Sequence, residues 1–79
     1  MTVETRVAES FLEAFELPAD FDPRGMKYRE HKAWSSMGHM VLVAVLEERF
    51  DCMLEADDIL EMSTFPKIVD IMARYDGDN

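Results

Sequence analysis

The segment from Ser36 to Phe50 is apolar on two opposite sides, and this feature limits the possible folds more than any other. At 100° per residue, one side of a helix over this segment collects residues that we assign to the core: His39, Leu42, Val43, Leu46 and Phe50. The opposite side collects Met37, Met40, Val41 and Ala44, and Glu48 continues that line. A chain of 79 residues buries only about 60% of its unfolded surface, so covering a helix on every side is difficult. We therefore expect the second side to stay exposed for a partner, with full burial of the helix as the alternative.

Three other segments have helical signals. Residues 3–16 carry apolar side chains at intervals of four, before Pro18 ends the helix: Val3, Val7, Phe11 and Phe15. Residues 56–62 form a short acidic helix in our prediction, with three side chains available to the core: Ile59, Leu60 and Met62. Residues 64–75 begin after a capping Ser63 or Thr64, tolerate Pro66 in the first turn, and point a stripe inward: Ile68, Val69, Met72 and Tyr75.

No helical period persists between Ala19 and Ser35, where Pro23 and Gly25 interrupt the chain. So long a connection in a small domain needs anchors, and the candidates are Phe21, Met26, Tyr28 and Trp34. Four of the eight basic residues also lie here, and they either offset the acidic helices or touch a partner: Arg24, Lys27, Arg29 and Lys32. With 48% hydrophobic residues, the chain predicts one all-α domain over residues 1–79, a bundle of three main helices and one short helix with a long loop between the first two main helices.

The net charge of −9 argues against nucleic-acid binding, which needs clustered basic side chains, and favours basic protein partners. Most of the excess lies in residues 36–79, which carry ten acidic and three basic side chains. The longest apolar run, Met40–Leu46, is too short to span a bilayer, and no apolar leader precedes the first helix. The single Cys52 fits a reducing compartment. We expect a monomeric cytoplasmic protein without a membrane role.

Catalytic and metal-binding patterns are missing from the sequence. His31, His39 and Cys52 do not have the spacing of metal ligands, and no orienting acid or oxyanion hole accompanies Ser36 and His39. The ending Asp76-Gly77-Asp78-Asn79 looks superficially like a calcium loop but lacks the other ligand positions and a following helix. We therefore expect neither an enzyme nor a metal site.

Two adjacent hydroxyls, Ser35 and Ser36, stand at the start of the Ser36–Phe50 helix. One of them, Ser35, can cap the helix by accepting a hydrogen bond from a backbone N–H, a contact worth about 1 kcal/mol. The partial positive charge of a helix N-terminus would also favour a phosphate esterified to Ser36.

These residues resemble the acyl carrier proteins. The resemblance covers about residues 3–75 and rests on WSSMGHMVLVAVLEERFD and the later LEADDILEMSTFPKIVDIM. In that family an Asp-Ser-Leu or Asp-Ser-Met motif opens the second helix, and its serine receives 4′-phosphopantetheine from coenzyme A through a phosphopantetheinyl transferase that uses magnesium. The match implies attachment at Ser36, followed by Met37, with acyl groups held as thioesters on the arm and no catalysis by the carrier itself. Ser35 departs from the family aspartate and removes a charge that helps the transferase recognise the site.

The resemblance also implies a docking surface. An apolar strip of Met37, Met40, Val41 and Ala44 would contact acyl-loading and acyl-processing enzymes, whose basic patches would meet Glu47, Glu48, Asp57, Asp58 and Glu61. The segments GHM, FDxML and MSTF are more similar to discrete carriers of specialised pathways, including those loaded with a glyceryl unit, than to the fatty-acid carrier. The alternative is a helical interaction module that has this fold and is never modified.

Overall fold

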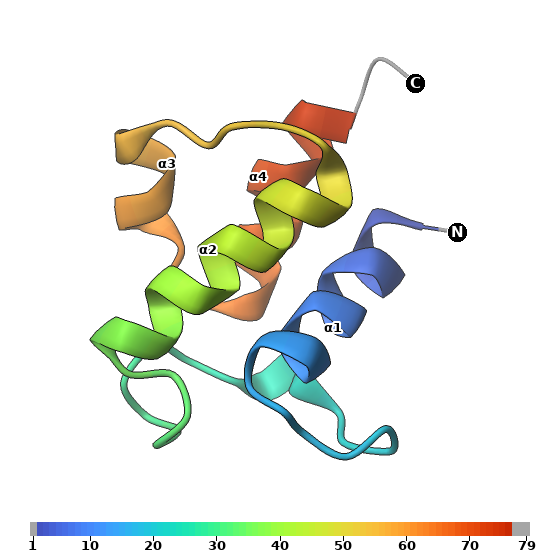
Figure 1. The fold of residues 1–79 in the computed structure, drawn as a ribbon, viewed down its shortest axis with the longest axis vertical. Helices are drawn as coiled ribbons and strands as arrows, with labels where there is room; N and C mark the ends of the chain where they lie inside the picture. Colours follow the sequence, from blue (N-terminus) through green and yellow to red (C-terminus); the bar gives the residue numbers. More distant parts are fainter. Residues whose placement is uncertain (1, 77–79) are drawn as a thin grey trace.

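Four α-helices and a short 3-10 helix follow one another along residues 2–76, the part of the chain described by the structure, which is a computed structural model (Figure 1). In chain order these elements are α1 (Val3–Ala14), η1 (Pro23–Gly25), α2 (Ser36–Phe50), α3 (Ala56–Glu61) and α4 (Phe65–Asp76). No β-strand occurs within residues 2–76, where Lys27 and Thr64 form an isolated antiparallel bridge. The all-α class and the four predicted helical segments are confirmed. The calcium-like ending continues into residues 77–79, which lie outside the described residues.

α1 ends two residues earlier than the spacing of its apolar residues predicts. Glu16 adopts a left-handed conformation with φ 53°, and the N–H of Leu17 bonds to the carbonyl of Leu12 at 3.0 Å. This backbone arrangement closes the last turn before Pro18 is reached. At the other end, the Thr2 side chain caps the helix by accepting a hydrogen bond from the N–H of Thr5.

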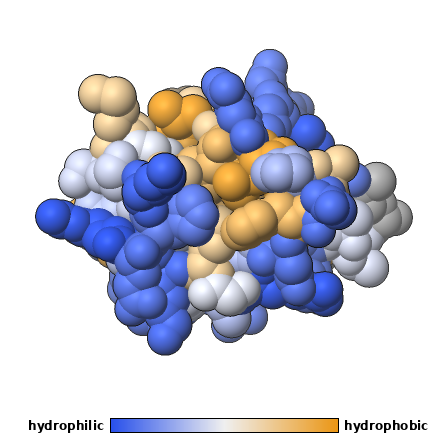
Figure 2. Space-filling view, turned by 90° about the horizontal axis from the view of Figure 1, so that it is seen from below, coloured by the Kyte–Doolittle hydropathy of each residue, from blue (hydrophilic) through white to orange (hydrophobic). Residues whose placement is uncertain are grey.

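The segment between α1 and α2 crosses the lower end of the bundle and is held by backbone contacts (Figure 1). The N–H of Tyr28 donates to the carbonyl of Ser63 at 2.9 Å, and the N–H of Arg29, which has φ 69°, donates to the carbonyl of Trp34 at 2.8 Å. Of the predicted anchors, Met26 and Trp34 are buried, while Phe21 and Tyr28 are half-buried. Figure 2 shows this end of the molecule, where hydrophobic surface gathers centrally between hydrophilic side chains.

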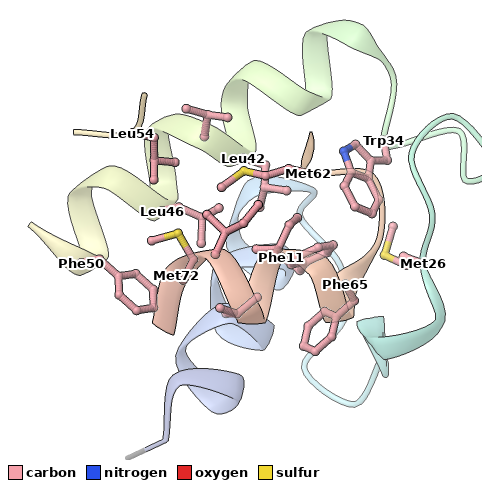
Figure 3. Packing of buried hydrophobic residues seen from close by; sticks show 14 residues of the cluster. Phe11, Met26, Trp34, Leu42, Leu46, Phe50, Leu54, Met62, Phe65 and Met72 are labelled. Atoms are coloured by element: carbon pink, nitrogen blue, oxygen red, sulfur yellow. The ribbon is translucent and has the colours of Figure 1, made fainter. Parts of the chain in front are cut away.

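Side chains from α1, α2, α4 and the connecting segments form the buried core (Figure 3). The side of α2 that we assigned to the core is buried at Leu42, Val43, Leu46 and Phe50. These side chains meet contributions from the other helices and connections: Val7, Phe11, Met26, Trp34, Leu54, Met62, Phe65, Ile68, Ile71 and Met72. Three of these rings pack together, because the Phe11 centroid lies 5.1 Å from Trp34 and 5.2 Å from Phe65. The buried Trp34 therefore fastens the long connection to α1.

α3 differs from the other helices because it contains no buried residue. Met62, just after the helix, is buried and Ile59 is half-buried, but Leu60 is 82% exposed. The expectation that Leu60 faces the core is therefore wrong. Ile59 and Met62 are three positions apart and share one face, whereas Leu60 is turned about 100° from Ile59, and so short a helix packs only one face.

Ion pairs join α1 to α2 and to α4. The Arg49 guanidinium of α2 contacts Glu9 at 3.2 Å and Glu13 at 2.8 Å on α1. Arg6 pairs with Asp76 at 2.7 Å, and its guanidinium carbon lies 4.1 Å from the ring centre of Phe50. Within residues 2–76 no helix combines the length and the apolar character needed to cross a bilayer.

Candidate functional site

The two serines at the start of α2 have separate structural roles. Ser35 is the N-cap: its Oγ accepts a hydrogen bond from the N–H of Gly38 at 3.2 Å, and its carbonyl accepts one from the N–H of His39 at 2.7 Å. Ser36 is the first residue of the helix and is exposed. The Ser35 hydroxyl is thus engaged in capping the helix, whereas the exposed Ser36 hydroxyl is not.

The Ser36 Oγ lies 3.0 Å from the phenolic oxygen of Tyr28, within hydrogen-bond distance. The half-buried ring of Tyr28 agrees with its predicted role as an anchor of the long connection. Its contact with Ser36 is not indicated by the sequence. The ring centre of Tyr28 lies 5.1 Å from that of His39 and 6.2 Å from that of Trp34. The surroundings of Ser36 are therefore aromatic on the inner side and open to solvent on the outer side.

His39 connects three parts of the fold beneath Ser36. The indole N–H of Trp34 donates to His39 Nδ1 at 2.9 Å, so Nδ1 must be the unprotonated nitrogen of the ring. The proton then resides on Nε2, which lies 2.9 Å from the carbonyl oxygen of Ile59 and donates to it. Because both ring nitrogens are engaged, His39 is a structural link between α2, the long connection and α3, and it has no nitrogen left to act as a general base.

Gly38 lets the first turn of α2 lie against the preceding connection. A Cβ built on Gly38 would stand 2.1 Å from the carbonyl oxygen of Ala33 and 3.3 Å from the Cε1 atom of Phe15. Only glycine permits so close an approach between two stretches of backbone. The close packing of the first turn of α2 against Ala33 thus depends on a residue that has no side chain.

The residues that we assigned to an apolar docking strip share one exposed side of α2. Met37 is 79% exposed, Met40 57% and Val41 44%, and Ala44 is also exposed. Full burial of α2, the alternative left open by the sequence, is therefore excluded. Two further large apolar side chains, which we did not assign to a surface, are also exposed. They are Leu60 and Met53, and Met53 is 84% exposed.

The five acidic residues assigned to the rim of this strip fall into two groups. Glu48, Asp57 and Glu61 are exposed. Glu47 accepts a hydrogen bond from the N–H of Leu54 at 2.9 Å, and so stabilises the connection after α2.

Asp58 forms the second exception to free exposure. Its carboxylate accepts a hydrogen bond from the Tyr75 hydroxyl at 2.5 Å and pairs with Arg74 at 3.2 Å. The hydrogen bond to Asp58 raises the pKa of Tyr75, because loss of the tyrosine proton would break it and place two negative charges side by side. Asp58 therefore anchors α3 to α4, whereas Glu48, Asp57 and Glu61 carry charge that faces solvent.

The described residues contain no group of three or more His, Cys, Asp or Glu side chains arranged to hold a metal ion. Cys52 is half-buried, and burial, together with the nearby charges of Glu47 and Asp51, raises the pKa of its thiol. A raised pKa lowers the fraction of reactive thiolate. Cys52 is thus a packing residue, as its isolated position in the sequence indicates.

Comparisons of the chain with known protein families, with curated proteins and with solved structures returned no match.

Proposed function

We propose that this protein has the acyl-carrier type of helical bundle and acts as an acyl carrier that receives a 4′-phosphopantetheine arm on Ser36. The observation that carries the proposal is the exposed Ser36 hydroxyl at the head of α2, directly beside the exposed strip of Met37, Met40 and Val41. A carrier needs an attachment hydroxyl that an enzyme can reach and a surface by which successive enzymes hold the protein. Both features lie on the same helix.

The residues around Ser36 fit a phosphate ester. The hydroxyl is on the first residue of a 15-residue helix, whose N-terminal partial positive charge favours an attached anion. Its outer side is open, and its neighbour Tyr28 offers a hydroxyl that can donate to an ester or phosphate oxygen. When bound, the arm would supply a thiol that holds acyl groups as thioesters.

The charges favour partners with basic docking surfaces. Glu48, Asp57 and Glu61 are exposed, while two of the three basic side chains after residue 35 are occupied: Arg49 by Glu9 and Glu13, and Arg74 by Asp58. Such charges mainly speed up and orient encounters, so binding to the phosphopantetheinyl transferase and to acyl-processing enzymes would be transient.

A second candidate function is an unmodified helical interaction module that uses the same strip. The observation in its favour is Ser35, because the N-cap position carries a neutral hydroxyl where the resembling family has an aspartate. Aspartate caps a helix about as well as serine, so capping does not require serine at this position. Serine instead lacks the charge that, by the resemblance, helps the transferase to recognise the site.

Intact-mass measurement after incubation with coenzyme A, magnesium and a broad-specificity phosphopantetheinyl transferase separates the two functions. We expect the wild type to gain one phosphopantetheine, Ser36→Ala to gain none, and Ser35→Ala to retain the gain at some cost in helix capping. Ser35→Asp keeps the cap and adds the missing charge, so it should be loaded faster than the wild type. If neither the wild type nor Ser35→Asp gains mass, the carrier function is refuted and the unmodified module is favoured.

A further inference from the structure

The hydroxyl of Tyr28 is the closest polar side-chain partner that the described residues give to Ser36, at 3.0 Å between the two oxygens. The contact joins the long connection to the first turn of α2 across eight residues of sequence. Neither capping nor core packing requires it: Ser35 already caps the helix, and the Tyr28 ring packs without using its hydroxyl. The contact of this hydroxyl with Ser36 is therefore not explained by the stability of the fold.

The position of this hydroxyl is set by the fold. The backbone N–H of Tyr28 donates a hydrogen bond to the carbonyl oxygen of Ser63 at 2.9 Å, and the adjacent antiparallel bridge joins Lys27 to Thr64. On the other side, the ring lies against His39 and Trp34, which are themselves hydrogen-bonded to each other. A side chain held in this way has already lost much of its rotational freedom, so its hydrogen bond costs little further entropy.

The chemistry of Ser36 gives the contact a direction. In the free protein either hydroxyl can donate to the other. During transfer, Ser36 Oγ forms a bond to the phosphorus that bears pantetheine, the bond from that phosphorus to the bridging oxygen of coenzyme A breaks, and adenosine 3′,5′-bisphosphate leaves. The serine proton passes to a base of the transferase. The esterified oxygen then has no hydrogen, so of the two oxygens only that of the Tyr28 hydroxyl can donate, and its partner is now part of an anionic phosphodiester.

We propose that Tyr28 is a positioning residue for Ser36. Its hydroxyl orients the Ser36 hydroxyl for transfer and then donates a hydrogen bond to the phosphodiester that forms there. This inference rests on the carrier function proposed above, and it assigns to the long connection a task at the attachment site besides closing the bundle.

Tyr28→Phe tests the proposal because it removes one oxygen and leaves the ring against Trp34 and His39. In loading assays we expect kcat to fall about two- to tenfold, the range of one net hydrogen bond, while the KM for the carrier stays close to that of the wild type because the α2 strip is unchanged. A purely structural role of Tyr28 would not lower kcat while leaving KM unchanged. In the loaded protein, the phosphorus resonance of the phosphodiester should shift in Tyr28→Phe and stay in place in the control Tyr75→Phe, whose hydroxyl contacts Asp58 instead.

A folded Tyr28→Phe protein with unchanged kcat and an unchanged phosphorus resonance overturns the proposal. A measurement on the loaded wild type needs no variant: nuclear Overhauser contacts between the Tyr28 ring protons and the Ser36 β-protons support it, and their absence contradicts it. If the wild type and Ser35→Asp are never loaded, the carrier function fails instead. The hydrogen bond is then tested by a double-mutant cycle of Tyr28→Phe and Ser36→Ala, where a coupling of about twofold or more in the unfolding equilibrium constant supports the contact and no coupling refutes it.

Discussion

Replacing Gly38 with alanine tests whether the start of α2 is fixed by its close approach to the preceding connection. In an ordinary helix this change stabilises by about 1 kcal/mol, because alanine loses less backbone entropy than glycine. Here the new Cβ would lie 2.1 Å from the Ala33 carbonyl oxygen, and that oxygen is backbone and cannot rotate away. Either α2 or the connection must move.

The expected magnitude follows from three contributions. Overpacking of this kind costs about 1–3 kcal/mol, and displacing the Gly38 N–H from Ser35 Oγ would weaken a cap worth about 1 kcal/mol. The helix-forming advantage of alanine offsets about 1 kcal/mol of this. We expect a net loss of about 2 kcal/mol in the free energy of unfolding, which lowers the Tm of a domain of this size by roughly 8–16 °C.

Urea unfolding followed by the fluorescence of Trp34, the single tryptophan of the chain, measures this loss. Gly25→Ala is the matched control: a Cβ there meets no atom within 4 Å, and its φ is not positive. Gly25→Ala should therefore be as stable as the wild type or slightly more stable. If Gly38→Ala also matches or exceeds the wild type, the close contact with Ala33 does not constrain α2 and the reasoning is refuted.

Two further predictions concern charge. Glu48→Lys should weaken association with a basic partner more at low salt than at high salt, because the exposed Glu48 attracts the partner over a distance at which salt screens charge. Asp20→Lys, which makes the same charge change in a groove beside α1, is the control and should weaken association less. Equal losses for Glu48→Lys at both salt concentrations would contradict this role. Tyr75→Phe should reduce the loss of stability at alkaline pH. The hydrogen bond to Asp58 raises the pKa of Tyr75, so its stabilising contribution is complete below the ordinary tyrosine pKa of about 10 and is lost as the pH rises through the folded-state value. Urea midpoints across that pH range check this, and equal alkaline losses in variant and wild type would count against it.

The sequence predicted both faces of α2 correctly, because fifteen residues sample the helical period several times. Leu42 and Leu46 had to be inside if Met37 and Val41 were outside. The same reasoning failed for Leu60, because α3 has only six residues and its apolar positions do not define one face uniquely. Packing against the neighbouring segments decided that Met62 is buried and that Leu60 is not.

The candidate site was only partly visible in the sequence. Periodicity and capping rules locate Ser35 and Ser36, since both depend on residues a few positions away. The contact between Tyr28 and Ser36 and the pairing of Asp58 with Tyr75 depend on how distant segments meet. A hydrogen bond between the backbone N–H of Tyr28 and the carbonyl of Ser63 holds Tyr28 in position. Nothing in the local sequence around either residue indicates that hydrogen bond.

The attachment of α3 to the rest of the molecule is concentrated at a few points. Leu54 and Met62, on either side of the helix, are buried, and the helix itself is joined to its neighbours by the hydrogen bond between the Ile59 carbonyl and His39 and by the contacts of Asp58 with α4. Because α3 contains no buried residue, local opening there would expose less apolar surface than separation of α1, α2 and α4. The amide hydrogens of α3 should therefore exchange with solvent faster than those in the middle of α2.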